Sequence, residues 1–101
     1  MDHTIIDQDL ELKHISEIDG EKFFISTIKM EVRHSWLNQH ENVNVYETMI
    51  FEKKDGKVMY DISLFNRRYT TYDNAVEGHD YVVKNIKKIV KMTRECRAKI
   101  L

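Results

Sequence analysis

Apolar and polar residues alternate along the first two thirds of the chain. Within residues 21–33 the apolar positions of one strand face are Phe24, Ile28, Met30 and Val32, and within residues 57–69 they are Val58, Tyr60, Ile62 and Leu64. A period of two residues is typical of a β-strand with one buried face. Residues 43–53 are also apolar and extended in character, so we predict strands over 21–33, 43–53 and 57–69.

Two Asp-Gly pairs, Asp19–Gly20 and Asp55–Gly56, lie beside these segments. Asp-Gly suits a two-residue type I′ hairpin turn, because both central residues of that turn need a positive φ. The second pair therefore predicts a hairpin between two of the strands above. Before the first pair, residues 10–18 are compatible with a partner strand or with a short helix, and we favour the strand.

An apolar stripe with helical spacing begins after the last strand. Its members are Tyr72, Ala75, His79, Val82, Ile86, Ile89, Thr93, Cys96 and Ile100. Spacings that alternate between three and four residues predict one amphipathic helix packed on the sheet. Thr71 is the expected N-cap, with its hydroxyl accepting from the backbone N–H of Asn74. Gly78 is costly inside a helix, so we expect it to permit a close approach to the sheet.

A length of 101 residues allows one domain. We predict an α+β domain over residues 1–101: an antiparallel sheet of three to four strands, built from two Asp-Gly hairpins, with one long C-terminal amphipathic helix. The mostly polar residues 34–42 should form the loop between the hairpins. Residues 1–9 should form an acidic lead-in that could be flexible.

The predicted helix is long for so small a domain. About 29 residues span about 44 Å, whereas a compact domain of this length is about 34 Å across. The last two turns would then project beyond the sheet and leave bare Ile89, Thr93, Cys96 and Ile100. The strand at 43–53 also carries apolar residues on both faces, and one helix covers only one of them. We therefore expect a homo-oligomer, most simply a two-fold dimer with those four residues as contacts.

Charge is segregated along the chain, although the formal net charge is only −1. Residues 1–21 hold seven acids and one base, a net −6, whereas residues 82–101 hold seven bases and one acid, a net +6. The two ends could attract each other within a chain or between chains. The candidate basic interaction face consists of Lys84, Lys87, Lys88, Lys91 and Arg94. Such a face is most often only solvated, but it could also bind nucleic acid or an acidic protein surface.

Composition excludes several protein classes. Apolar residues make up 42% of the chain, which is too many for a disordered segment, and no run of about 18 apolar residues could cross a membrane. The N-terminus is acidic and lacks the apolar core of a secretory signal. The one cysteine, Cys96, cannot form an internal disulfide, which fits a reducing cytoplasm. We expect a cytoplasmic protein without a membrane partner.

The residues give little support for catalysis. The histidines are His3, His14, His34, His40 and His79. No pair among them has the i, i+4 spacing of a helical metal site. Cys96 has no histidine within one helical turn to activate it, no serine lies in a nucleophile elbow, and there is no glycine-rich phosphate loop. We predict no metal, no cofactor and no enzymatic activity.

His79 differs from the other histidines because it lies on the inward stripe of the predicted helix, directly after Gly78. It could act as an acid, a base or a ligand contact. A core histidine that is hydrogen-bonded to a strand is the more common case. Glu47, the isolated acid in the strand at 43–53, is one candidate partner.

The corner where the last strand meets the helix is a candidate ligand site. The ligand-binding residues proposed there are Arg67, Arg68, Thr70 and Thr71, together with His79. Free N–H groups at a helix start, two hydroxyls and a guanidinium suit an anion. Consecutive arginines on a strand point to opposite faces, so one of them would serve the site. In the structural alternative, an arginine pairs with Glu47 or Asp61, and Tyr69 closes the core.

Two segments, 46–51 and 67–83, resemble a pattern found in small uncharacterised bacteriophage proteins. In that pattern an ETM-V/I-F strand precedes an acidic-Gly turn, and R-Y-x-T then opens a helix with A-x-x-G-H. The matching residues are Glu47, Thr48, Met49, Ile50, Phe51, Arg68, Tyr69, Thr71, Ala75, Gly78 and His79. The resemblance implies a phage or prophage origin and the cytoplasm of an infected or lysogenic bacterium. It carries no assigned activity and therefore no functional residue.

Three functions remain open at this point. The first is a non-enzymatic phage-type accessory protein that acts as a homodimer. It would bind a host or defence component, or bind and inhibit it. The second is an anion- or nucleotide-binding protein that uses the strand–helix corner. The third is nucleic-acid binding through the basic C-terminal helix.

Overall fold

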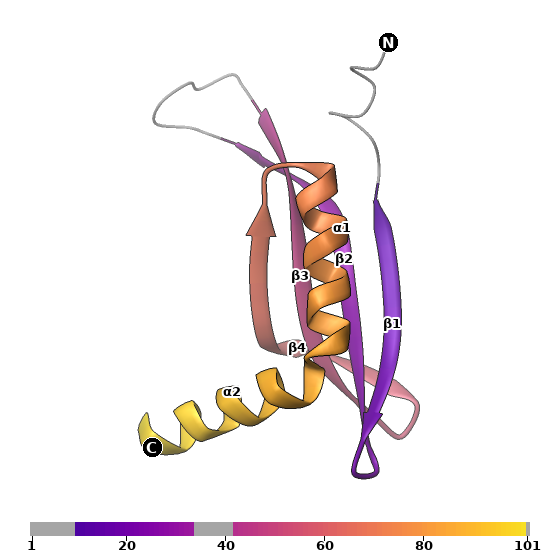
Figure 1. Ribbon diagram of the computed structural model, residues 1–101, viewed down its shortest axis with the longest axis vertical. Coiled ribbons are helices and arrows are strands. Elements are labelled where there is room, and N and C mark those ends of the chain that lie inside the picture. The colour runs from indigo at the N-terminus through magenta and orange to yellow at the C-terminus, as the bar shows by residue number, and fades with distance from the viewer. Residues whose placement is uncertain (1–9, 34–41, 101) are drawn as a thin grey trace.

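The structure, a computed structural model, describes residues 10–33 and 42–100 (Figure 1). A four-stranded antiparallel sheet is followed by two helices. The strands are β1 (Glu11–Ile18), β2 (Glu21–Arg33), β3 (Asn42–Lys54) and β4 (Lys57–Tyr69), and the helices are α1 (Tyr72–Lys84) and α2 (Ile86–Ile100). The predicted α+β class is confirmed. The lead-in predicted at 1–9 and the loop residues 34–41 lie outside the described residues.

The strands lie in the order β1-β2-β3-β4, so each strand pairs with its neighbour in sequence. Residues 11–18, for which the sequence allowed either a strand or a short helix, form strand β1 and pair with β2. In the two connections φ is 52° and 86° at Asp19 and Gly20, and 52° and 77° at Asp55 and Gly56. Positive values at both central positions are those of a type I′ turn, which aspartate and glycine adopt at low cost.

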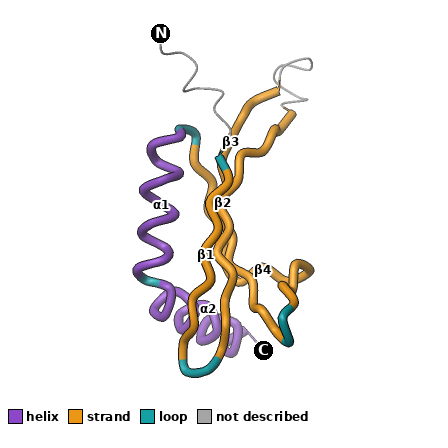
Figure 2. The backbone as a smooth tube through the Cα atoms, turned by 90° about the vertical axis from the view of Figure 1, so that its right-hand side faces the viewer, coloured by secondary structure: helices purple, strands orange, loops and turns teal. Residues whose placement is uncertain are grey.

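The pairing of β4 with β3 is uneven. Its register shifts on either side of Phe51, and four residues of β4, 59–62, face the single residue Glu52 of β3. Extra residues in one strand bend it and increase its twist. The end of the β3–β4 hairpin accordingly swings away from the rest of the sheet (Figure 2).

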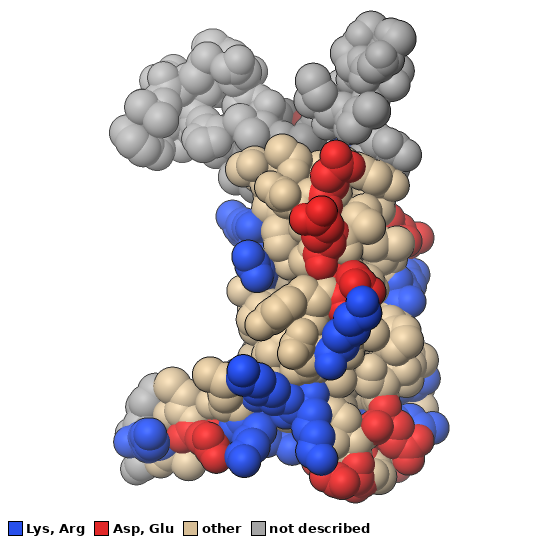
Figure 3. All heavy atoms as spheres, in the orientation of Figure 1, with Lys and Arg blue, Asp and Glu red and all other residues tan. Residues whose placement is uncertain are grey.

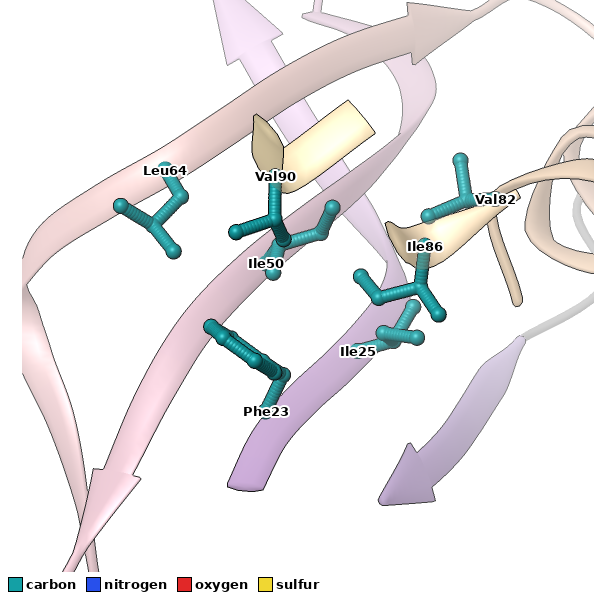
Figure 4. Packing of buried hydrophobic residues seen from close by; sticks show 7 residues of the cluster. All are labelled: Phe23, Ile25, Ile50, Leu64, Val82, Ile86 and Val90. Atoms are coloured by element: carbon teal, nitrogen blue, oxygen red, sulfur yellow. The ribbon is translucent and has the colours of Figure 1, made fainter. Parts of the chain in front are cut away.

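Both helices contribute to one core on one face of the sheet. α1 lies along β2 and β3, and α2 crosses the lower end of the sheet toward β4 (Figure 1). The main core lies beneath the junction of the helices (Figure 4), and its buried residues are Phe23, Ile25, Ile50, Leu64, Val82, Ile86 and Val90. A second buried cluster lies under the start of α1 and consists of Leu10, Tyr46, Tyr69 and Ala75.

The prediction of one continuous helix is wrong, because α1 ends at Lys84 and α2 begins at Ile86. Asn85 between them has φ −113° and ψ 19°, outside the helical range. Its backbone N–H and its side-chain Nδ2 both donate to the Tyr81 carbonyl, at 3.0 and 2.8 Å. Asparagine side chains compete with a helix by bonding nearby backbone groups. The chain therefore turns at Asn85, and α2 folds back onto the core.

Candidate functional site

Three polar side chains form a hydrogen-bonded chain between α1 and the sheet. His79 Nδ1 lies 2.7 Å from Thr27 Oγ1, which lies 2.5 Å from Thr48 Oγ1. Thr27 and Thr48 are opposite each other on β2 and β3, and both are fully buried. The inward stripe of α1 brings His79 over this pair.

Burial limits what this chain of side chains can do. It lowers the pKa of His79 below the ordinary value of 6.5; the charge of His14 lowers it further, and Asp80 opposes the shift. Both threonine hydroxyls are closed off from solvent, so no substrate can reach them. The hydrogen bonds satisfy polar groups in the helix–sheet interface. The half-buried His79 is therefore hydrogen-bonded to a strand in the helix–sheet interface, which is the more common case for such a histidine.

Glu47 is not the partner of His79, because it lies on the opposite face of the sheet. Its carboxylate accepts from Asn66 Nδ2 at 3.1 Å and lies 3.6 Å from Arg68 Nε. Glu47 is only 5% exposed, and a buried carboxylate needs such partners. The structural alternative, in which an arginine pairs with Glu47, is the arrangement observed for Arg68.

Tyr69, the last residue of β4, packs directly beneath Gly78 of α1. A Cβ on Gly78 would overlap the ring and hydroxyl of Tyr69, so only glycine allows this approach. Tyr69 is buried, and within the described part of the chain its hydroxyl has no hydrogen-bond partner. The close approach predicted for Gly78 is the one observed, and Tyr69 closes the core.

Part of the predicted anion site is brought together. Arg67, Arg68 and Thr70 line one hollow at the strand–helix corner, together with Asn74 and Gly78 of α1. The guanidinium of Arg67 lies over the Tyr69 ring, 5.5 Å from its centre, and Arg68 also pairs with Glu47. Thr71 and His79 do not line this hollow. Thr71 is the N-cap of α1, and its hydroxyl accepts from the backbone N–H three residues later at 3.1 Å.

The corner opens into a long groove between β4 and the two helices. The groove has two parts, of about 690 and 370 Å³, which share Arg67 and Tyr81. Its walls include Phe65, Arg67, Tyr81, Lys88, Ile89 and Met92. Tyr81 and Met92 were not among the predicted site residues, because side chains on the outward face of an amphipathic helix normally contact only solvent.

Arg94, predicted on the basic face, joins α2 to the sheet. Its guanidinium makes two contacts with the Glu21 carboxylate, at 2.9 and 3.0 Å, and one with Glu52 at 2.7 Å. These hydrogen bonds hold the pKa of both carboxyls below the ordinary 4.5. The attraction expected between the acidic and basic ends of the chain is therefore present within one molecule, and Arg94 takes part in it.

The other predicted basic residues stay on the surface. Lys84 lies 3.0 Å from Asp80, one turn earlier in α1. Lys87, Lys88 and Lys91 are exposed on α2. Basic side chains gather where α1 meets α2, below the acidic side chains along α1 (Figure 3).

The four predicted dimer contacts do not form one bare apolar strip. Ile89 packs against the main core, Thr93 is half-buried in the wall of the groove, and Cys96 is exposed. The side chain of Ile100 lies outside what the structure describes. The turn at Asn85 is the reason, because it brings the first half of α2 onto the sheet.

The sheet face opposite the helices carries exposed apolar side chains. Ile15 of β1 pairs with Phe24 of β2, and the Tyr60 ring packs edge-on against Phe24 and Phe51. Ile15 is 49%, Ile28 39% and Tyr60 67% exposed. Within the described residues no helix covers this face (Figure 2).

Thr27 and Thr48 were missed by the sequence analysis. A signal was present, because Thr27 follows Phe23 and Ile25 at every second position and Thr48 likewise precedes Ile50. A polar, β-branched residue in line with inward apolar residues indicates a buried hydroxyl that needs a partner. Their partner His79 is far away in sequence, so the trio could not be assembled from spacing alone.

No protein-family model, curated protein or solved structure matches this chain. Neither described helix is long and apolar enough to cross a membrane. Across residues 10–33 and 42–100, no three His, Cys, Asp or Glu side chains gather as metal ligands would; His3, His34 and His40 lie outside those ranges. The phage resemblance and the expectation of no metal, cofactor or enzymatic activity stay predictions.

Proposed function

We propose that this chain is a non-enzymatic binding protein that self-associates as a homodimer. The observation that carries the proposal is the apolar cluster of Ile15, Phe24, Phe51 and Tyr60 on the sheet face that the helices leave uncovered, with the exposed Ile28 farther along the same face. Contiguous apolar patches on soluble proteins commonly mark interaction sites. The burial of Thr27 and the engagement of Arg68 and Arg94 leave few polar groups for catalysis.

The size of this face suits a second copy. β1 has 8 residues, β2 and β3 have 13 each, and β4 pairs with β3 over residues 63–69. At about 3.3 Å per residue and about 4.8 Å per strand, the face covers about 650 Å², which is within the range of about 600–1,000 Å² that each partner contributes to a standard interface. Two such faces would pack as a sandwich of two sheets.

Analytical ultracentrifugation of face variants tests the dimer. We expect the wild type to sediment at twice 12.1 kDa at micromolar concentration, and Ile15→Glu and Ile28→Glu to sediment as monomers. Val76→Glu is the matched control, because Val76 is 38% exposed but lies on α1, and it should stay dimeric. A monomeric wild type, or a dimer that both face variants retain, would reject the proposal.

The phage resemblance suggests where such a dimer would act. It would be an accessory factor in the cytoplasm of an infected bacterium that binds, and thereby inhibits, a host or defence protein. Affinity purification from bacterial lysate tests this role, with the wild type and Arg67→Glu as parallel baits. Failure to recover any specific partner would count against the role without affecting the dimer.

Nucleic-acid binding is the second candidate, supported by exposed Lys87, Lys88 and Lys91 beside Lys84. Affinity for duplex DNA should fall steeply between about 50 and 200 mM salt if several phosphates are contacted. Lys87→Glu with Lys91→Glu should abolish retention, while the control Lys57→Glu, on β4 at the β3–β4 turn, should not. Absence of retention at low salt would remove this candidate.

Nucleotide binding at the strand–helix corner is the third candidate and has less support, because Arg68 and Thr71 are already engaged. A thermal-shift screen with ATP, GTP and cyclic nucleotides tests it. Stabilisation should be lost in Arg67→Ala. No stabilisation of the wild type, or the same stabilisation in that variant, would remove it.

A further inference from the structure

β4 is an edge strand, and its outer side faces the groove. In the described part of the chain its strand neighbour is β3 alone, so another strand does not use the backbone groups along its outer edge. The Phe65 carbonyl accepts a hydrogen bond from Ser63 Oγ at 2.9 Å. Arg97 Nη2 donates to the Ser63 carbonyl at 2.9 Å, where α2 approaches β4. Proteins usually protect such an edge, because it is a template for pairing with another chain.

The groove includes this edge and not merely one face of β4. Phe65 and Arg67 line it from the helix side of the strand, and Asn66 and Arg68 line it from the opposite side. Neighbouring residues of a strand point to opposite faces. A groove that contacts the side chains of these four residues therefore also contacts the backbone between them. The wall facing the edge comes from α1 and α2.

The side chains along the groove have a definite chemical character. Phe65, Ile89 and Met92 form an apolar section, and Met92 is 57% exposed. Arg67 and Lys88 place cations beside it. Glu77 is the acid among the described residues that line the groove, in the part next to α1. In Figure 3, uncharged surface lies between two basic groups on the β4 side of the molecule.

We propose that this groove binds an extended peptide segment of a partner protein, which adds to β4 as a fifth strand. Backbone hydrogen bonds to residues 65–69 would supply affinity, and alternate side chains would supply specificity. This edge of five residues is about 17 Å long, which accommodates about five peptide residues. The segment carries apolar side chains for the section around Met92 and a carboxylate for Arg67 and Lys88.

A single strand suits this edge better than a second copy does. The C-terminal part of α2 extends past β4 (Figure 1), so a whole sheet would meet α2 before its edge reached β4. An isolated peptide strand lies within the groove without that obstruction. This surface is separate from the uncovered sheet face, so the peptide site and the proposed dimer can fail independently.

Selection from a display library of random ten-residue peptides on the immobilised full chain tests the site. We expect enriched sequences with alternating apolar residues, at least one Asp or Glu, and no central proline. In calorimetry with the best synthetic peptide, Lys88→Glu and Met92→Glu should each weaken binding at least about tenfold. Both residues are exposed, so the fold should tolerate the changes. Val76→Glu, outside the groove, should bind like the wild type.

Amide hydrogen exchange locates the peptide on the backbone. Amides within residues 65–69 should gain protection when the peptide is added, and N-methylation of alternate peptide amides should abolish binding. The proposal would be overturned by no enriched peptide, by unchanged affinity in both groove variants, or by protection elsewhere. Protection of residues 65–69 that rises with protein concentration alone would also overturn it, by assigning the edge to a second copy.

Discussion

The two halves of the helical layer hold the sheet by different means. α1 places Val82 in the main core but otherwise uses small and polar groups: Gly78 rests on the Tyr69 ring, and His79 is bonded to Thr27. α2 uses aliphatic side chains such as Ile86, which enter the main core, and a guanidinium clamp at its surface. The packing of α1 should therefore be most sensitive to an added atom or a lost hydrogen bond. The packing of α2 should be most sensitive to the loss of apolar volume.

The largest expected effect is in the α2 half. Ile86→Ala removes buried side-chain volume from the main core, and we expect it to lower the free energy of unfolding by about 3 kcal/mol. Urea denaturation measures this change. Met92→Ala on the same helix is the control; Met92 is 57% exposed, and its loss should be below about 0.5 kcal/mol. Equal effects of the two variants would show that α2 does not pack as described.

Gly78→Ala tests the steric fit of α1. The added methyl group overlaps the buried Tyr69 ring, and we expect a net loss of about 1–3 kcal/mol by urea denaturation. Alanine would otherwise stabilise a helix interior by about 1 kcal/mol relative to glycine, so the sign of the change is decisive. Glu77→Ala, at the exposed neighbouring position, should be nearly neutral. A stabilised Gly78→Ala would contradict the close packing.

Thr27→Val tests the polar chain under α1. Valine keeps the shape but leaves both His79 and Thr48 without the hydroxyl they share, and we expect a loss of about 1–2 kcal/mol. Thr48→Val is the matched control, because it keeps the bond between Thr27 and His79, and it should cost less. Equal stability of wild type and Thr27→Val would show that the hydrogen bonds contribute nothing.

The pH dependence of stability sharpens the same point. Burial lowers the pKa of His79 in the folded chain. As the pH falls below 6.5, the unfolded chain therefore binds more protons at this residue than the folded chain does. Unfolding then becomes easier as the pH falls from about 7.5 toward 5.5. His79→Gln should reduce this slope in urea midpoints measured across that range. A slope unchanged in the variant would assign it to other histidines.

The smallest expected effect is at the α2 clamp. Arg94→Ala removes contacts to Glu21 and Glu52, but Arg94 and Glu21 are largely exposed, so we expect a loss of no more than about 1 kcal/mol. Both carboxyls have a lowered pKa, so this stabilisation is present above pH 4.5 and is lost as the pH falls through the folded values. The loss of stability on acidification should be smaller in Arg94→Ala than in the wild type. Thermal denaturation at pH 7 and pH 3 measures the difference.

Local signals were enough to predict several elements. The period of two residues identified β2 and β4, although Ile28 and Tyr60, which belong to that pattern, lie on the face that the helices leave uncovered. Thr71 was recognised as the N-cap because the cap interaction spans only three residues. The break at Asn85 was missed although an asparagine was visible. The apolar stripe continues through it, and the turn combines the hydrogen bonds of Asn85 to Tyr81 with the burial of Ile86 and Val90 in the main core.

The candidate sites depended more on the fold than on local pattern. Strand alternation predicted that Arg67 and Arg68 point to opposite faces, but only the fold decided that Arg68 is the one that pairs with Glu47. The groove could not be predicted, because it needs β4, α1 and α2 in place at once. Ile28 and Phe24 could be assigned to one strand face, but whether a helix covers that face is decided only when the layers pack.

The sequence by itself determined the class of the fold, the strand segments, the Asp-Gly turns and the start of the first helix. These features depend on interactions within a few residues, which periodicity and turn chemistry encode directly. The tertiary structure alone decided that Asn85 divides the helix, that His79 bonds Thr27, and that Arg94 is held by Glu21 and Glu52. Those outcomes join residues up to 73 positions apart, and such partners are selected by packing and by the need to pair buried polar groups.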